Sequence, residues 1–338
     1  MRARLFGALG SVAGAGAAAV AVSAFLRDAD EVQPARFGAL TLAKSEVRPG
    51  ECTFNAERPT HRILELRGDA LRVPEARSAL AILSYYVKEP TLQVERPYTP
   101  IAMHARGEAP AGLTLLVKRY VDGEVSRYLH RLRPGASVEV RGPEVTWELP
   151  RGSAVPRRIY MIVGGTGIAT AAQLVSSVMR AGLRAPPRIS VLYAAPSLDA
   201  MQLVPELAEA QRRGVVDMYL WTEKVEAQAR GRLSAADGRM VDAEVVPRPR
   251  RRAWSCGPGD VRTLRVGAED IPLHTGRIGV QDISALVENA RDALVLVCGP
   301  DGFVSAIAGP RGRDLVSQGA LGGYLALLGF ERAQVFKL

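Results

Sequence analysis

Cysteine and histidine are scarce in this chain of 338 residues, which has three cysteines and four histidines. Cys52, Cys256 and Cys298 lie far apart and are odd in number, so they form neither a disulfide framework nor a zinc site. The histidines make no cluster, and no histidine and aspartate are spaced to make Cys298 the nucleophile of a thiol protease. The sequence therefore predicts no metal site, and the cysteines indicate no particular compartment.

Aromatic residues are also few, at 6% of the chain, and only Trp254 lies near the arginine-rich run at residues 247–252. Proteins that bind single-stranded nucleic acid interleave aromatic and basic side chains, so we expect no nucleic-acid partner. The net charge of +9 suits an acidic partner or an anionic membrane surface. Much of the positive excess lies in the arginine-rich run, however, so a solvated surface loop without any partner also accounts for the net charge.

Charge is absent from residues 5–26, which follow Arg2 and Arg4 and precede an acidic cluster. A helix of this length spans a bilayer at about 1.5 Å per residue. Three interpretations stay open: a single-pass anchor, a cleaved secretory signal, and a mitochondrial targeting segment whose apolar part remains as an anchor. The arginines before the segment favour an N-terminus on the matrix or cytosolic side, with the bulk of the chain across the membrane.

Residues 36–154 read as short apolar segments divided by proline, glycine and charged turns. Several short strands at this spacing predict a closed antiparallel β-barrel, with one short helix at residues 125–132. The expected strands cover residues 38–45, 62–66, 81–88, 112–120 and 137–141.

Residues 155–338 have a different pattern, in which apolar strands alternate with helices. This alternation predicts an α/β domain with a parallel sheet and helices on its faces. An insertion at about residues 225–270 interrupts it, and its glycine, proline and arginine content predicts a flexible excursion. The excursion is either a docking loop for an acidic redox partner or lipid headgroups, or a plain surface loop. The expected strands are 159–163, 189–194 and 216–222, and the expected helices are 171–180 and 203–213.

The run Arg96-Pro97-Tyr98-Thr99-Pro100 ends an alternating segment at residues 91–95. Its prolines stiffen the chain. The run can present a guanidinium to a phosphate, a phenol ring to a flat heterocycle and a hydroxyl to a ring nitrogen. A surface strand that leads into a turn is the alternative interpretation.

Three further segments suit a dinucleotide. The helix expected after Gly123 begins with N–H groups that lack intrahelical acceptors, so a diphosphate would fit there. The runs Gly164-Gly165-Thr166-Gly167 and Cys298-Gly299-Pro300 each follow an expected strand of the parallel sheet. Ligands of such sheets bind outside the carboxyl ends of the strands, so both runs are candidates for a nucleotide site.

Taken in order, these runs and the last residues of the chain resemble the NADH-cytochrome b5 reductase branch of the ferredoxin-reductase-like flavoproteins. The resemblance covers the chain from about residue 37 onward, apart from the insertion. It implies an FAD-binding barrel of about six strands, FAD and NADH as cofactors, and hydride transfer from NADH to the flavin. It also implies two catalytic residues: Thr99, which lies near the flavin N5, and Cys298, which lies beside the nicotinamide and positions the ring.

The resemblance implies a larger set of cofactor-binding residues. In relatives that use NADH, an acidic residue past the third strand of the sheet accepts the ribose hydroxyls, and Glu223 has that position. A solvated loop charge is the alternative for Glu223. The implied set is Arg96, Tyr98, Thr99, Val117, Lys118, Tyr120, Gly123, Val125, Ser126, Gly164, Gly165, Thr166, Gly167, Glu223, Cys298, Gly299 and Pro300.

The chain departs from the family pattern at several places, and two of them bear on turnover. Ala169-Thr170 stands where relatives have Thr-Pro, so one hydroxyl near the flavin is lost or displaced. Relatives commonly end on an aromatic residue, whereas this chain ends Lys337-Leu338. Both differences leave open a degenerate scaffold that keeps the fold without turnover.

The CGPDGF run, a QGALGG run at residues 318–323 and the apolar N-terminus together resemble a fungal mitochondrial branch of this family. That branch is held in the inner membrane, faces the intermembrane space and is linked to haem reduction during cytochrome c maturation. We therefore expect a membrane-anchored NADH reductase that serves haem or a haem protein: cytochrome c, its maturation machinery, or cytochrome b5. A general cytochrome b5 reductase of the outer membrane or endoplasmic reticulum is the alternative enzyme.

Overall fold

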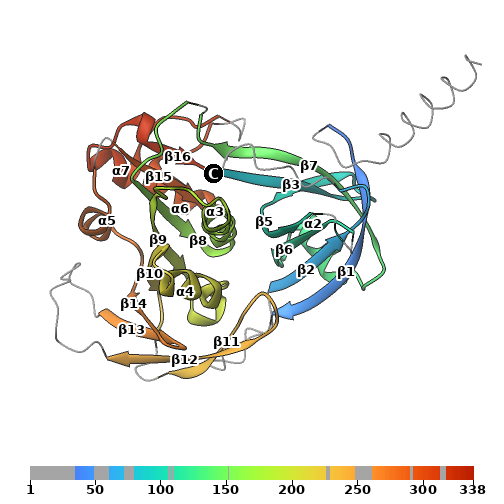
Figure 1. Ribbon diagram of the computed structural model, residues 1–338, viewed down its shortest axis with the longest axis horizontal. Helices are drawn as coiled ribbons and strands as arrows, with labels where there is room; N and C mark the ends of the chain where they lie inside the picture. Colours follow the sequence, from blue (N-terminus) through green and yellow to red (C-terminus); the bar gives the residue numbers. More distant parts are fainter. Residues whose placement is uncertain are drawn as a thin grey trace, which may run out of the picture.

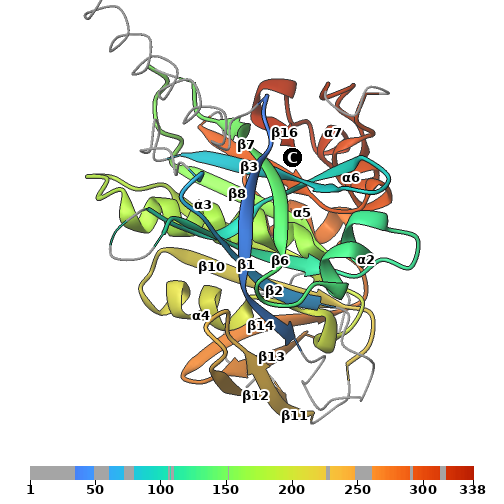
Figure 2. The same ribbon diagram turned by 90° about the vertical axis from the view of Figure 1, so that its right-hand side faces the viewer.

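A computed structural model describes residues 35–48, 61–71, 80–105, 107, 110–150, 152–225, 229–247, 261–289, 292–312 and 317–338. These residues form two β-sheets and a set of helices, packed around hydrophobic cores of which one is shared by both sheets (Figures 1 and 2). The predicted anchor at residues 5–26 lies outside the described residues. Among the helices that are described, none is both long and apolar enough to cross a bilayer.

The first sheet is antiparallel and curls around a core of leucine and valine side chains. Alternate residues of its strands point inward, and Leu42, Leu64 and Leu115 are completely buried there. The helix α2 (Glu124–Arg131) packs against this sheet through buried Val125 and Leu129. Seven strands lie in the order β4-β3-β7-β1-β2-β6-β5: β1 (Gly38–Arg48), β2 (His61–Arg67), β3 (Ala81–Glu89), β4 (Val94–Tyr98), β5 (Pro100–His104), β6 (Gly112–Lys118) and β7 (Ser137–Glu148).

The predicted antiparallel barrel is therefore confirmed as a barrel-like sheet, with seven strands instead of about six. The additional strand arises because the RPYTP run divides at Thr99 into β4 and β5. Pro100 lacks an N–H, so a single continuous ladder through the run is not available. A strand that leads into a turn was the alternative interpretation of this run, but a second strand directly after the turn was not predicted.

The second sheet has nine strands, in the order β11-β12-β13-β14-β10-β9-β8-β15-β16. The pairs from β14 to β16 are parallel, which confirms the predicted parallel sheet. Its strands are β8 (Arg158–Gly164), β9 (Arg188–Ala195), β10 (Val216–Thr222), β11 (Arg230–Ser234), β12 (Met240–Pro247), β13 (Val261–Val266), β14 (Glu269–Thr275), β15 (Ala293–Cys298) and β16 (Val335–Lys337).

Helices cover both faces of this sheet. Along β8 the inward side chains alternate, so Met161 belongs to the core on one face and Ile162 to the core on the other. The helices α3 (Ile168–Arg180) and α4 (Val204–Arg212) cover the first face, and α5 (Val280–Leu286), α6 (Asp301–Ala308) and α7 (Gly323–Leu327) cover the second. Three short 3-10 turns complete the domain: η1 (Gly165–Gly167), η2 (Leu198–Ala200) and η3 (Arg332–Gln334).

The prediction of a flexible excursion at residues 225–270 is wrong for most of that segment. The strands β11, β12 and β13 extend the sheet by three antiparallel ladders beyond β14. Alternating apolar residues explain this, because Leu233, Val245 and Leu264 are buried against α4 and its neighbours. The arginine-rich residues 248–252, on which the docking hypothesis depended, lie outside the described residues.

Candidate active site

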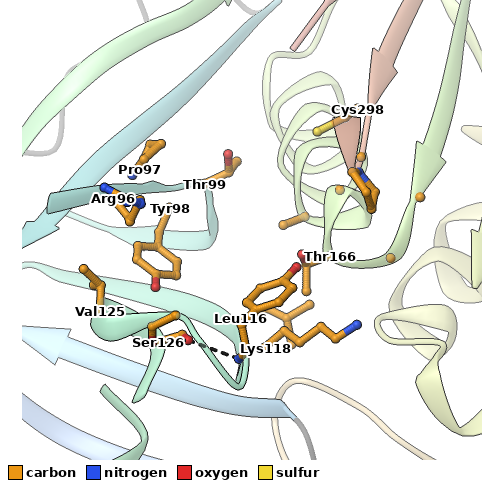
Figure 3. A pocket seen from close by; sticks show the side chains of 18 of the residues that line it. Arg96, Pro97, Tyr98, Thr99, Leu116, Lys118, Val125, Ser126, Thr166 and Cys298 are labelled. Atoms are coloured by element: carbon orange, nitrogen blue, oxygen red, sulfur yellow. Dashed lines mark hydrogen bonds between the residues drawn. The ribbon is translucent and has the colours of Figure 1, made fainter. Parts of the chain in front are cut away.

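A cavity of about 730 Å³ lies between the barrel and the parallel sheet. Four chain segments line it: the β4–β5 corner, the turn before α2, the turn after β8 and the turn after β15. Figure 3 shows Arg96, Tyr98 and Thr99 on one side of this space and Thr166 and Cys298 on the other. The structure thus brings together segments that are 200 residues apart in the sequence.

The β4–β5 corner supplies a cation and a phenol. The Nη1 of Arg96 donates to the backbone carbonyl of Glu95 (2.7 Å), and within the described residues the exposed guanidinium of Arg96 has no acidic partner. Burial, with a smaller contribution from Tyr120, raises the pKa of Tyr98 well above its ordinary value, so its ring stays neutral. An unpaired guanidinium beside a neutral aromatic ring fits a phosphate attached to a flat ring system.

The hydroxyl of Thr99 belongs to a chain of hydroxyls. Its Oγ1 lies 3.2 Å from Ser84 Oγ, which in turn lies 2.8 Å from Thr146 Oγ1. Ser84 is buried on β3 and Thr146 lies on β7, so two neighbouring strands orient the predicted catalytic threonine. The sequence did not indicate Ser84 or Thr146, because a single hydroxyl in a strand carries no signal of its partner.

The turn before α2 is built by Gly123 and Ser126. The Ser126 hydroxyl donates to the Gly123 carbonyl (2.9 Å) and accepts from the Tyr120 N–H (3.1 Å). A Cβ at position 123 would come within 2.6 Å of Ser126 Oγ and 2.9 Å of Tyr120 Cβ, so only glycine fits. The turn therefore offers the backbone at the start of α2 to a ligand in the cavity, and Lys118 lies beside it with Nζ 5.4 Å from the Tyr120 ring.

The opposite wall consists mainly of backbone. Gly165 has a φ of +56°, which favours glycine, and a Cβ on Gly167 would lie 2.8 Å from the carbonyl oxygen of Cys298. The two turns thus touch each other through the glycine. Thr170, the first hydroxyl after this turn, donates to the Gly167 carbonyl (2.8 Å) and fixes the start of α3.

Cys298 lines the cavity at the end of β15 and is the one free cysteine among the described residues. Burial raises the pKa of its thiol, an effect that Arg311 and the Thr170 hydroxyl partly oppose. A protonated thiol is a weak nucleophile. The thiol is therefore not activated as a nucleophile, and the positioning role of Cys298 stays a prediction.

Fifteen of the seventeen predicted site residues line the cavity, and two do not. The Val117 side chain is completely buried in the barrel core, and its carbonyl accepts a hydrogen bond from His130 Nε2 (3.0 Å). Glu223 lies past β10 and pairs with Arg277, with 2.8 Å between Oε1 and Nε. Neither observation tests a contact with a cofactor, so the roles of Val117 and Glu223 stay predictions.

Several lining residues are absent from the prediction. They are direct neighbours of the predicted runs, so the motifs themselves were the available signal. Ala169 lines the cavity, as the departure from the family pattern anticipated, whereas the Leu338 side chain lies in the hydrophobic core and not in the cavity wall. The lining residues that the prediction missed are Val94, Pro97, Leu116, Asp122, Glu124, Ala169, Thr170 and Asp301.

Comparisons with known proteins agree with this geometry. Residues 71–149 match the family model described as an oxidoreductase FAD-binding domain. A NADH-cytochrome b5 reductase-like protein from Arabidopsis thaliana is 29% identical over 267 residues, which cover 79% of this chain and 67% of the relative. The cytochrome c mitochondrial import factor CYC2 of Saccharomyces cerevisiae is 25% identical over 297 residues, 75% of this chain and 71% of that protein.

A solved structure shares the fold. The cytochrome b5 reductase domain of Ulva prolifera nitrate reductase superposes with a TM-score of 0.56 at 18% identity, and the match covers 91% of this chain and 99% of that one. The family match and the reductase relatives support the predicted cofactors, FAD and NADH. These matches support the resemblance of this chain to the NADH-cytochrome b5 reductases and the presence of an oxidoreductase FAD-binding domain.

Proposed function

We propose that this protein is an FAD-dependent oxidoreductase that takes electrons from NADH and passes them to haem or a haem protein. The observation that carries the proposal is the single cavity that joins the RPYTP corner to the Cys298 turn. Bound there, FAD would accept a hydride from NADH together with a solvent proton, and would release the two electrons singly. The cofactor supplies this chemistry, and the protein supplies its binding and its orientation.

The barrel side is suited to hold FAD. Arg96 and the turn at Gly123 and Ser126 would hold the diphosphate, since an unpaired guanidinium and a helix N-terminus both attract anions. Tyr98 would pack on or beside the flavin ring, and Lys118 with Tyr120 would border the tail of the cofactor. Thr99 would donate or accept a hydrogen bond near N5.

The sheet side is suited to hold NADH. The turn at residues 164–167 and the turn at residues 298–300 leave room for a ring because glycines line both. Cys298 would contact the nicotinamide and place it over the flavin. Glu223 would accept hydrogen bonds from the ribose hydroxyls of NADH, once its ion pair with Arg277 has opened. Together the two walls would exclude water from the transferred hydride.

For the cellular role, we place residues 5–26 in the mitochondrial inner membrane, with the two domains in the intermembrane space, and assign the chain to cytochrome c maturation. The similarity to a protein named as a cytochrome c mitochondrial import factor supports this assignment. A general NADH-cytochrome b5 reductase is the second candidate, which the name of the Arabidopsis relative favours.

The test uses the purified full chain. A yellow protein whose flavin absorbance is bleached by NADH supports the enzyme, whereas a stable, colourless protein that takes up no FAD supports a scaffold and overturns the proposal. Reduction of ferricyanide, cytochrome b5, cytochrome c and haem is then measured side by side. Preference for haem or cytochrome c supports the role in maturation, and preference for cytochrome b5 supports the second candidate.

A further inference from the structure

One glutamine joins the two walls of the cavity. Gln173 lies on α3, belongs to the nucleotide domain and is only 2% exposed. Its side-chain amide makes three hydrogen bonds to the backbone of the barrel. Nε2 donates to the carbonyls of Pro100 (2.9 Å) and Leu83 (3.1 Å), and the Leu83 N–H donates to Oε1 (2.7 Å).

The barrel groups that Gln173 contacts lie at irregular points of the sheet. β3 and β7 shift register between Ile82 and Leu83, and β5 and β6 shift register between Pro100 and Ala102. A shift of this kind takes backbone groups out of the regular ladder, and buried groups of this type need another partner. The glutamine amide supplies that partner at both shifts, which is a more specific arrangement than a chance contact between two packed surfaces.

The same three hydrogen bonds reach residues next to the predicted catalytic Thr99 and next to its hydroxyl partner Ser84. Pro100 follows Thr99, and Leu83 precedes Ser84, whose hydroxyl lies 3.2 Å from the Thr99 hydroxyl. On the helix, Gln173 lies one turn after Ala169 and Thr170, which line the cavity next to the glycine turn. In Figure 1, α3 lies between the parallel sheet and the barrel strand β5.

Apolar packing brings the two domains together but leaves their relative position loosely specified. Ile63, Ile101 and Leu116 of the barrel share one core with Leu174 and its neighbours on α3. Hydrophobic contact is non-directional, whereas hydrogen bonds constrain both distance and angle. Gln173 is therefore suited to fix the position of one wall against the other.

We propose that Gln173 is a positioning residue for hydride transfer: it sets the placement of the flavin wall at Thr99 relative to the nicotinamide wall at residues 164–170. This inference rests on the proposed function, because it assigns a step of that reaction to the cavity. Hydride transfer depends steeply on the approach of the two rings, and a displacement of about 1 Å can cost about 100-fold in rate.

The first test replaces Gln173 with methionine, which keeps the length of the side chain and removes all three hydrogen bonds. We expect the limiting rate of flavin reduction by NADH, measured by stopped flow on the full chain, to fall about 10-fold or more. The dissociation constants of FAD and NADH should change less than about 3-fold, because the binding residues remain.

A matched control is available within the nucleotide domain. Gln211 on α4 also makes side-chain hydrogen bonds, from Nε2 to Glu269 Oε2 (3.2 Å) and from the Met218 N–H to Oε1 (3.0 Å), but none of these reaches the barrel. Gln211→Met should keep the wild-type limiting rate. An equal loss of rate in both variants would overturn the proposal in favour of general destabilisation.

A second readout does not depend on turnover. Hydrogen exchange of the Leu83 amide in the flavin-free protein should accelerate in Gln173→Met and stay slow in Gln211→Met. If Gln173→Met does not fold, Gln173→Asn is used, since it keeps the amide but is too short to span the gap. A variant with fast exchange at Leu83 and an unchanged limiting rate would show that the Gln173 hydrogen bonds only stabilise the structure, and would overturn the proposal. If wild-type protein binds FAD but NADH does not bleach it, the proposed function fails first and this inference fails with it.

Discussion

The two walls of the cavity are held in place by different means. On the barrel wall, side-chain hydroxyls bond to one another and to the backbone, as in the Thr99–Ser84–Thr146 chain and in the Ser126 turn. On the sheet wall, glycines allow two backbone turns to touch, with a Gly167 Cβ position 2.8 Å from the Cys298 carbonyl. The barrel wall is therefore held by side-chain hydrogen bonds, whereas the close contact in the sheet wall requires the absence of a side chain at Gly167.

This difference predicts opposite sensitivities. Removal of an atom should damage the barrel wall in small steps, because each hydrogen bond contributes about 0.5–1.5 kcal/mol. Addition of one atom should damage the sheet wall abruptly, because backbone cannot give way as a flexible side chain can. The following substitutions test the comparison, from the largest expected effect to the smallest.

The largest effect is expected for Gly167→Ala. The new methyl group would meet the carbonyl oxygen of Cys298 at 2.8 Å, so the nicotinamide turns must separate. We expect the limiting rate of flavin reduction by NADH to fall about 100-fold while FAD stays bound. Gly302→Ala, where a Cβ meets no atom within 4 Å, is the matched control and should behave as wild type. A wild-type rate in Gly167→Ala would show that the close approach of the two turns is unimportant.

The second effect is expected for Arg96→Gln on the barrel wall. It removes a cation that has no acidic partner among the described residues and that we assign to the FAD diphosphate. Because hydrogen bonds to charged groups contribute about 1.5–3 kcal/mol, FAD affinity should fall about 10- to 100-fold. Titration of the flavin-free protein by fluorescence quenching measures this. Arg119→Gln makes the same change in net charge at an exposed residue outside the cavity and should leave the affinity near wild type.

The sequence was sufficient to predict most of the cavity because ordered motifs supplied its walls. RPYTP, the Gly123 turn, GGTG and CGP each carry their own local signal, and fifteen of the residues predicted from them line one cavity. The spacing of short strands between turns likewise predicted the barrel, and the alternation of apolar strands with helices predicted the parallel sheet, since both patterns are local. Arg96, Gly167 and Cys298 are examples of predicted residues that line the cavity in the structure.

The remaining features depend on contacts between distant residues. Ser84 and Gln173 sit in ordinary strand and helix sequences, and their partners Thr99 and Pro100 lie 15 and 73 residues away. The strands β11 to β13 were mistaken for an excursion because glycine, proline and arginine mask a weak alternation. Local composition could not reveal that the sheet edge at β14 was available for pairing.

A moderate effect is expected for Ser84→Ala. The substitution removes the buried hydroxyl that lies between Thr99 and Thr146 and leaves the fold around it unchanged. Two hydrogen bonds are lost, but only the one to Thr99 reaches the cavity, so we expect the limiting rate of flavin reduction to fall about 2- to 10-fold. Thr114→Ala, which removes a half-buried hydroxyl of β6 outside the cavity lining, is the control for a general effect on the barrel. A loss as large as that of Gly167→Ala would contradict the graded sensitivity proposed for the barrel wall.

The smallest effect concerns acid. Burial lowers the pKa of His130 below its ordinary value, and the hydrogen bond from its Nε2 to the Val117 carbonyl joins α2 to β6. The folded protein therefore keeps this histidine neutral, while the unfolded chain takes up a proton near the ordinary pKa of about 6.5. The contribution of neutral His130 to the free energy of unfolding is fully present above that pH and is lost as the pH falls below it. We expect the urea midpoint of the wild-type protein to decrease between pH 7 and about 5, and to decrease less in His130→Gln, whose amide can still donate to Val117.

His104→Gln, which replaces an exposed imidazole on β5, should keep the wild-type acid response. On the sheet wall burial raises the pKa of Cys298, so its contribution is lost only as the pH rises above the ordinary range of a thiol. Acid should therefore weaken the barrel wall first, and an unfolding midpoint that responds equally in wild type and His130→Gln would refute that order.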